Sequence, residues 1–169
     1  MSEVAVRHAR PSDLAYLSSI EESGADTFAR AGIPLVDRAP PSAPDHWAPS
    51  LEAGVLWVAD DPRAGPIGFL AGKLEDGGLH IEEIDVAMER QREGHGRRLI
   101  QRAAEWARER GLAVLTLTTF RAVAWNGPFY ASLGFVEPSP AETPAWLEAI
   151  LAKEAARGFK DRCAMRLAL

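Results

Sequence analysis

The sequence predicts an α/β fold, with a mixed, mostly antiparallel sheet and helices on both of its faces. Between residues 55 and 86, three β-rich runs are separated by clusters of turn residues, which is typical of an antiparallel meander. After the meander, an amphipathic helical pattern precedes another strand-like run. A strand, a helix and a strand within about 30 residues are the size of a crossover that joins parallel strands, so part of the sheet is expected to be parallel.

The first unit is a strand followed by a helix. Residues 4–7 have the composition of a short strand, and Ser12 precedes apolar residues at helical spacing over 14–20, which predicts a helix capped by Ser12. Prolines remove backbone donors and disfavour regular structure. Residues 32–49 are therefore expected to form a surface loop with at most a short helix, because five prolines fall in this stretch: Pro34, Pro40, Pro41, Pro44 and Pro49.

The meander begins with a hairpin. Residues 55–59 and 67–74 are apolar and rich in β-forming side chains, and the seven residues between them are dense in Asp, Pro and Gly. Gly77-Gly78 makes the next turn, and residues 79–86 form the third predicted strand.

In the rest of the chain, the spacing of apolar residues alternates between that of a helix and that of a strand. Apolar residues from 99 to 107 share one helical face, and Gly111 ends this helix. A strand is predicted at 114–118, a short helix at 128–133, a longer helix at 145–156 and a closing strand at 162–167. We interpret residues 1–169 as a single domain, since too little chain follows the last loop to build a second core.

Composition excludes several classes of function. Hydrophobic residues make up 47% of the chain and charged residues 25%, as in ordinary globular proteins. The net charge of −5 argues against a nucleic-acid partner, because such binding relies on clustered cations. No apolar run approaches the ~20 residues that cross a bilayer, and the start lacks the layout of a signal peptide, so we expect a cytoplasmic protein without a membrane partner.

Cys163 is the only cysteine. An intrachain disulfide and a cysteine-built zinc site are therefore impossible, and without clustered histidines no metal is expected. Cys163 also falls in the final predicted strand, away from every motif, so a covalent acyl-enzyme route is not indicated.

The most informative stretch is residues 86–99, where a strand ends in a polar turn and two glycines open a helix. Gly94 and Gly96 would let a ligand approach the backbone, and the free N–H groups of the first helical turn attract anions such as a pyrophosphate. The alternative is a simple tight turn. A dinucleotide fingerprint would need glycine in place of Leu99, and a phosphate loop would need Gly-Lys followed by Ser or Thr, which the chain lacks.

The segment Gln91-Arg92-Glu93-Gly94-His95-Gly96 resembles the coenzyme A loop of the GNAT N-acetyltransferases. The resemblance covers at least residues 55–135 in element order. Residues 79–86 match the fourth strand of that family, and residues 126–135 are similar to its tyrosine-containing helix that ends in Gly-Phe. The resemblance implies an acetyl-CoA-dependent N-acetyltransferase in which two splayed parallel strands hold the cofactor.

The resemblance also implies which residues meet acetyl-CoA. The backbone around Val86 and Met88 would pair with the pantetheine arm, and Asn126 would contact that arm or the attacked centre. Asn126 is four residues from Tyr130, whereas many family members have about seven between the two, and a helix cap is its alternative role. The pyrophosphate would be held by four backbone amides, those of Gly94, His95, Gly96 and Arg97, and Arg92 or Arg97 would be free to add charge-assisted hydrogen bonds.

Two roles remain for the chemistry. An ammonium must lose a proton before its nitrogen attacks the thioester, and the departing thiolate gains from a proton donor. Glu82, Glu83 or His80 is the candidate base, and Tyr130 is the candidate acid. Glu82 is preferred because the resemblance implies a polar catalytic or substrate-contacting residue at its place, nine residues before Gln91. Strand alternation predicts that Glu82 shares a face with His80 and Ile84, and Glu83 with Ile81 and Asp85. The alternative for each glutamate is a solvated or ion-paired residue.

The acceptor is expected to be a small-molecule or peptide amine. Glu21, Glu22 and Asp26 could meet a cationic amine or could form a solvated helix face. Alternatives to an N-acetyltransferase are an acyl-CoA sensor without turnover and a transferase of longer acyl groups. The tryptophans at 57, 106, 125 and 146 are assigned to the core or a pocket wall, and a homodimer is a possible assembly.

Overall fold

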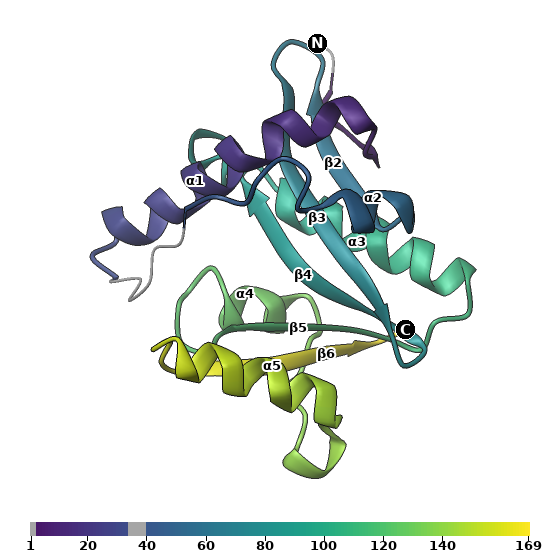
Figure 1. Cartoon of the computed structure of the whole chain (residues 1–169), viewed down its shortest axis with the longest axis vertical. Coiled ribbons are helices and arrows are strands. Elements are labelled where there is room, and N and C mark those ends of the chain that lie inside the picture. Colours follow the sequence, from purple (N-terminus) through teal and green to yellow (C-terminus); the bar gives the residue numbers. More distant parts are fainter. Residues whose placement is uncertain (1–2, 34–39) are drawn as a thin grey trace.

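A twisted sheet of six strands, in the order β1-β2-β3-β4-β5-β6, runs through the part of the chain that the structure describes, residues 3–33 and 40–169 (Figure 1). The structure is a computed structural model. Pro34 lies outside the described residues. The strands are β1 (Ala5–His8), β2 (Leu56–Asp61), β3 (Gly65–Glu75), β4 (Gly78–Val86), β5 (Val114–Phe120) and β6 (Arg162–Ala168).

Helices connect and cover these strands. They are α1 (Leu14–Arg30), α2 (Ala48–Glu52), α3 (His95–Glu109), α4 (Gly127–Ser132) and α5 (Ala145–Ala156), with single 3₁₀ turns η1 (Pro11–Asp13), η2 (Met88–Arg90) and η3 (Pro140–Glu142). Apart from α1, which continues ten residues beyond the apolar pattern over 14–20, the predicted helices and strands agree with these bounds to within a few residues. Within the described residues, no helix combines the length and the apolar character that a membrane span requires.

The sheet is antiparallel except at one junction. β2, β3 and β4 form the predicted meander, whereas β4 and β5 are parallel and pair only at Leu79 with Leu115 and at His80 with Thr116. Beyond these two pairs the strands diverge (Figure 1). The mixed, mostly antiparallel sheet with a splayed parallel pair is therefore confirmed.

A β-bulge in β4 changes which residues share a face. Ala71 pairs with Glu83 and Gly72 pairs with Ile81, so Glu82 has no partner on β3. An extra residue in one strand reverses the alternation beyond it. The predicted faces of Glu82 with Ile84 and of Glu83 with Ile81 are therefore wrong: Ile84 packs against the same core as Ile81, while Glu83 and Asp85 lie on the opposite face.

Two apolar layers enclose the sheet. α3 packs on one face over a core that includes Trp57, Leu99 and Trp106, and the two indole rings meet edge to face with centroids 5.6 Å apart. α1 and α2 cover the other face, where Leu17 packs in a cluster with Phe69. The assignment of Trp57 and Trp106 to the core is confirmed, because each is at most 5% exposed.

The predicted cap of the first helix is wrong. Ser12 lies inside η1, and Asp13 is the N-cap residue of α1 without a side-chain capping bond; its buried carboxylate instead accepts hydrogen bonds from the Arg10 amide at 2.7 Å and from Arg7 Nη1 at 2.7 Å. A carboxylate can satisfy an amide and a guanidinium together, which a hydroxyl cannot match. Burial acts to raise the pKa of Asp13, but the hydrogen bonds from Arg7 and Arg10 lower it below its ordinary value.

Candidate functional site

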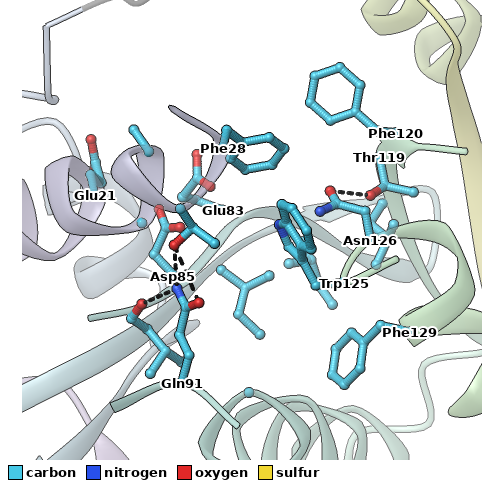
Figure 2. A pocket seen from close by; sticks show the side chains of 18 of the residues that line it. Glu21, Phe28, Glu83, Asp85, Gln91, Thr119, Phe120, Trp125, Asn126 and Phe129 are labelled. Atoms are coloured by element: carbon cyan, nitrogen blue, oxygen red, sulfur yellow. Dashed lines mark hydrogen bonds between the residues drawn. The ribbon is translucent and has the colours of Figure 1, made fainter. Parts of the chain in front are cut away.

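A cavity of about 1250 Å³ opens where β4 and β5 separate. Its walls come from α1, the ends of β4 and β5, the first turn of α3, α4 and the segment between α5 and β6. Figure 2 shows acidic side chains on one side of this space and an amide and a hydroxyl on the other, with aromatic rings between them. The splayed strand pair therefore brings together segments that are distant in the sequence.

The first turn of α3 forms one wall of the cavity. Gly94 is the N-cap residue with a φ of 85°, and a Cβ there would meet no atom within 4 Å. At Gly96 a Cβ would face Phe129 Cζ at 3.8 Å. The N–H groups of this turn have no partner within the helix, so the wall is suited to an anion.

Gln91 fastens the loop that precedes α3. Its Nε2 donates to the Val86 carbonyl at 2.9 Å and to Thr27 Oγ1 at 3.0 Å, so one amide joins the loop to the end of β4 and to α1 (Figure 2). This gives the first residue of the Gln-x-x-Gly-x-Gly pattern a positioning role that its sequence spacing does not reveal.

His95, Arg92 and Arg97 all line the cavity, but they differ in exposure. His95 is 6% exposed; its Nε2 lies 2.9 Å from Glu93 Oε2, while its Nδ1 is buried without a hydrogen-bond partner among the described residues. The two arginines are exposed at the rim. They can move toward a bound anion at little cost.

Val86 and Met88 also line the cavity. The Met88 N–H donates to Ser23 Oγ at 2.8 Å, and the Val86 carbonyl accepts the Gln91 amide described above. The expected pairing of this backbone with a pantetheine arm would have to use the second lone pair of the Val86 carbonyl or displace these side chains.

Asn126 occupies the N-cap position of α4, but its side chain makes no capping hydrogen bond. Thr119 Oγ1 instead donates to Asn126 Oδ1 at 2.8 Å (Figure 2). This bond fixes the amide, and the Asn126 NH₂ has no hydrogen-bond partner among the described residues. The side chain is thus held ready to donate into the cavity, and its alternative role as a side-chain cap is not observed.

Glu83 and Asp85 place a pair of neighbouring carboxyls in the wall of the cavity. Burial, followed by the nearby charge of Glu21, raises the pKa of Glu83 to about 7. Burial and the charge of Glu83 also raise the pKa of Asp85. Two close carboxyls in a desolvated place resist being ionised together, so the two groups titrate as a unit and both pKa values lie above their ordinary range.

Helix α1 makes room for this pair. A Cβ on Gly24 would collide with Asp85 Oδ1, so only glycine permits this packing. The carboxylate of Glu21, one turn earlier, accepts hydrogen bonds from Trp47 Nε1 at 2.7 Å and from the Ser42 amide at 2.8 Å. These donors hold the Glu21 carboxylate in place beside the pair.

Tyr130 lies in α4 and is 8% exposed, with its ring packed against Phe129 and Phe135. It lines the cavity, and its hydroxyl has no hydrogen-bond partner among the described residues. Burial and the nearby charges of Glu83 and Asp85 raise the pKa of Tyr130 above its ordinary value. The phenol therefore stays protonated at neutral pH.

The other two candidate bases have different surroundings. Glu82, at the bulge, is an exposed lining residue, and partial desolvation raises its pKa. His80 is not brought to the cavity: it is 5% exposed, its Nδ1 lies 2.9 Å from Thr116 Oγ1, and its ring packs against Trp146. Burial lowers the pKa of His80 to about 4. We therefore no longer assign His80 as a base.

Several lining residues were not singled out from the sequence. Asp85 and Thr119 acquire their roles only through the bulge and the strand divergence, and Phe28 and Phe120 carry no local signal. Trp125, by contrast, was assigned to the core or a pocket wall and is confirmed as wall. Within residues 3–33 and 40–169, no cluster of three or more His, Cys, Asp or Glu side chains is arranged to hold a metal ion.

Comparison with known proteins places this architecture in a family. A family model described as "Acetyltransferase (GNAT) family" matches residues 24–135. Similar solved structures are PaiA N-acetyltransferase from Thermoplasma acidophilum (13% identity, TM-score 0.71, 100% of both chains covered) and ribosomal-protein-S18-alanine N-acetyltransferase from Escherichia coli (20%, 0.69, 97% of this chain and 92% of that one). A GNAT acetyltransferase from Staphylococcus aureus Mu50 is also similar (15%, 0.72, 98% and 99%). The matched segment includes α3, the splayed strands and most of the cavity wall, and the chain therefore belongs to the GNAT family of acetyltransferases.

Proposed function

We propose that this protein is an acetyl-CoA-dependent N-acetyltransferase that transfers an acetyl group to a primary amine by direct attack within a ternary complex. The observation that carries the proposal is the position of the Glu83–Asp85 pair, which faces the same cavity as the anion-binding turn of α3. A proton acceptor and a site for a phosphorylated cofactor are the two parts that this reaction needs.

The residues present fit the cofactor. The N–H groups of Gly94 to Arg97 would hold the pyrophosphate, with Arg92 and Arg97 near enough to add charge, and the gap between β4 and β5 would accept the pantetheine arm. The buried, unpartnered Nδ1 of His95 is a further polar atom in this wall. PaiA, whose fold is similar, was solved in complex with coenzyme A. When bound, acetyl-CoA supplies the activated thioester.

The carboxyl pair would accept the proton of the substrate ammonium, directly or through a water. A carboxylate of ordinary pKa near 4.5 is too weak a base for efficient transfer at neutral pH, whereas the pKa of Glu83 near 7 matches the task. Glu83 is therefore preferred over Glu82, whose exposed side chain remains the second candidate.

Tyr130 would act at the other end of the reaction. Its hydroxyl remains protonated near the acid pair and can donate to the departing thiolate. The Asn126 amide, fixed by Thr119, can donate a hydrogen bond to the cofactor or to the attacked carbonyl.

The test begins with titration calorimetry of the protein with acetyl-CoA and with coenzyme A, followed by a free-thiol release assay across an amine panel. We expect micromolar cofactor binding and amine-dependent thiol release that falls by about 100-fold or more in Glu83→Gln. Glu82→Gln is the matched control on the same strand. Cofactor binding without turnover of any amine would favour the alternative function, an acyl-CoA sensor. No cofactor binding would refute the proposal.

A further inference from the structure

Four aromatic side chains line the cavity without belonging to either apolar core cluster: Phe28, Phe120, Trp125 and Phe159. Phe28 meets Trp125 edge to face with centroids 5.4 Å apart and lies 5.6 Å from Phe120, which contacts Phe159 at 6.0 Å. Trp125 stays 37% exposed. We call these four residues the aromatic wall.

The aromatic wall adjoins the acid pair through one face of α1. Glu21, Gly24 and Phe28 are spaced at i, i+3 and i+7, so they lie along a single stripe of the helix. Gly24 packs on Asp85, and Phe28 follows one turn later. Figure 2 shows Phe28 and Trp125 between the carboxyls of Glu83 and Asp85 and the Thr119–Asn126 bond.

The charges beside this wall are negative where the amine would react. The Glu21 carboxylate accepts hydrogen bonds from the Trp47 indole and the Ser42 amide, and the carboxyls of Glu83 and Asp85 lie beside it. At the far end of the wall, two guanidinium groups already stack on its rings: Arg162 lies over Phe120 at 4.5 Å from the ring centroid and Arg157 over Phe159 at 5.2 Å. Glu154 binds Arg162 at 3.0 Å. A ligand with an ammonium at one end and an uncharged aromatic ring at the other matches this distribution.

We propose that the acceptor is a small primary amine that carries an aromatic ring on a short alkyl chain. The inference rests on the proposed function and narrows its substrate. The ammonium faces Glu21 and the acid pair, and the ring packs on Phe28 and Trp125. In the reaction, the ammonium passes one proton to the Glu83–Asp85 pair, and the freed amine nitrogen bonds to the acetyl carbon as the carbon–sulfur bond breaks. The thiolate takes a proton from Tyr130, and the second proton that the acylated nitrogen loses restores the phenol.

The test compares 2-phenylethylamine with n-propylamine, which keeps the primary amine and lacks the ring. We expect kcat/KM to favour 2-phenylethylamine by at least about tenfold, since small changes in apolar contact already discriminate substrates on this scale. Trp125→Ala and Phe28→Leu should lower that preference about tenfold, mainly through KM. Tyr16→Ala removes an aromatic ring from the same helix outside the cavity and should leave the preference unchanged.

Calorimetry of 2-phenylethylamine with the coenzyme A-bound protein separates this inference from the proposed function. Binding that weakens in Trp125→Ala, without turnover, would support the aromatic acceptor site and refute the transferase. Turnover of n-propylamine as efficient as that of 2-phenylethylamine, or a preference unchanged in both cavity variants, would overturn the aromatic acceptor and leave the transferase standing. Thermal melts of each variant confirm that the fold is intact.

Discussion

Replacing Glu83 with glutamine should stabilise the protein while it abolishes activity. The carboxylate lies in a desolvated place beside Glu21, so ionisation is less favourable there than in the unfolded chain. Below pH 4.5 Glu83 is protonated in both the folded and the unfolded state and does not lower the free energy of unfolding. As the pH rises toward about 7, the folded state must either keep the proton or bear a desolvated charge, and stability is lost.

The magnitude follows from the pKa of Glu83, about 7 in the folded protein against 4.5 for the free side chain. At about 1.4 kcal/mol for each pH unit, the full cost above pH 7 is roughly 3 kcal/mol. Because Asp85 titrates together with Glu83, part of this cost persists in the variant, and we expect a gain of about 1–3 kcal/mol at pH 8. In a chain of this size the gain corresponds to a rise in Tm on the order of 2–10 °C.

The assay is urea denaturation of the wild type, Glu83→Gln and Glu82→Gln at pH 5 and pH 8. Glu83→Gln should differ little from the wild type at pH 5 and should be more stable at pH 8. Glu82→Gln, an exposed substitution on the same strand, should stay within about 0.5 kcal/mol at both. An equal effect of Glu83→Gln at the two pH values, or destabilisation at pH 8, would refute the raised pKa and the role built on it.

Three further perturbations test separate parts of the molecule. The kcat/KM of the wild type should fall about tenfold per pH unit below pH 7, because the Glu83 base must be ionised. Glu21→Gln removes a neighbouring negative charge, so it should move this acidic limb of the pH profile to lower pH. An unmoved limb would exclude the Glu21 charge as a cause of the raised pKa of Glu83. Gly94→Glu should weaken coenzyme A binding in calorimetry more than tenfold, since it places a carboxylate beside the expected pyrophosphate, and unchanged affinity would rule out this anion site. Arg7→Met should destabilise the fold by about 3 kcal/mol at neutral pH, because it leaves the buried Asp13 without its cation. This loss of stability should shrink as the pH falls through the lowered pKa of Asp13, because the protonated carboxyl no longer needs the cation. A loss of stability that does not depend on pH would argue against the ion pair as its source.

Local patterns determined much of this protein. The meander, the α3 helix and the crossover could be predicted from the spacing of apolar residues, the turn residues and the positions of the glycines. These features depend on residues close in the chain. The same reasoning located the loop before α3 and the helix that carries Tyr130. The exclusion of an intrachain disulfide also needed nothing beyond the single Cys163.

The tertiary structure decided the chemistry of the site. Strict alternation paired Glu82 with Ile84, but the bulge at Glu82 reverses the faces beyond it and sends Glu83 with Asp85 into the cavity. A bulge depends on how two strands pair, and the alternation of residues along one strand does not show where such an extra residue lies. The raised pKa of Glu83 likewise requires Gly24 and Glu21 of α1 to pack over β4, some 60 residues away in the chain. Burial and the proximity of charge are properties of the folded arrangement, and they select Glu83 over its neighbours.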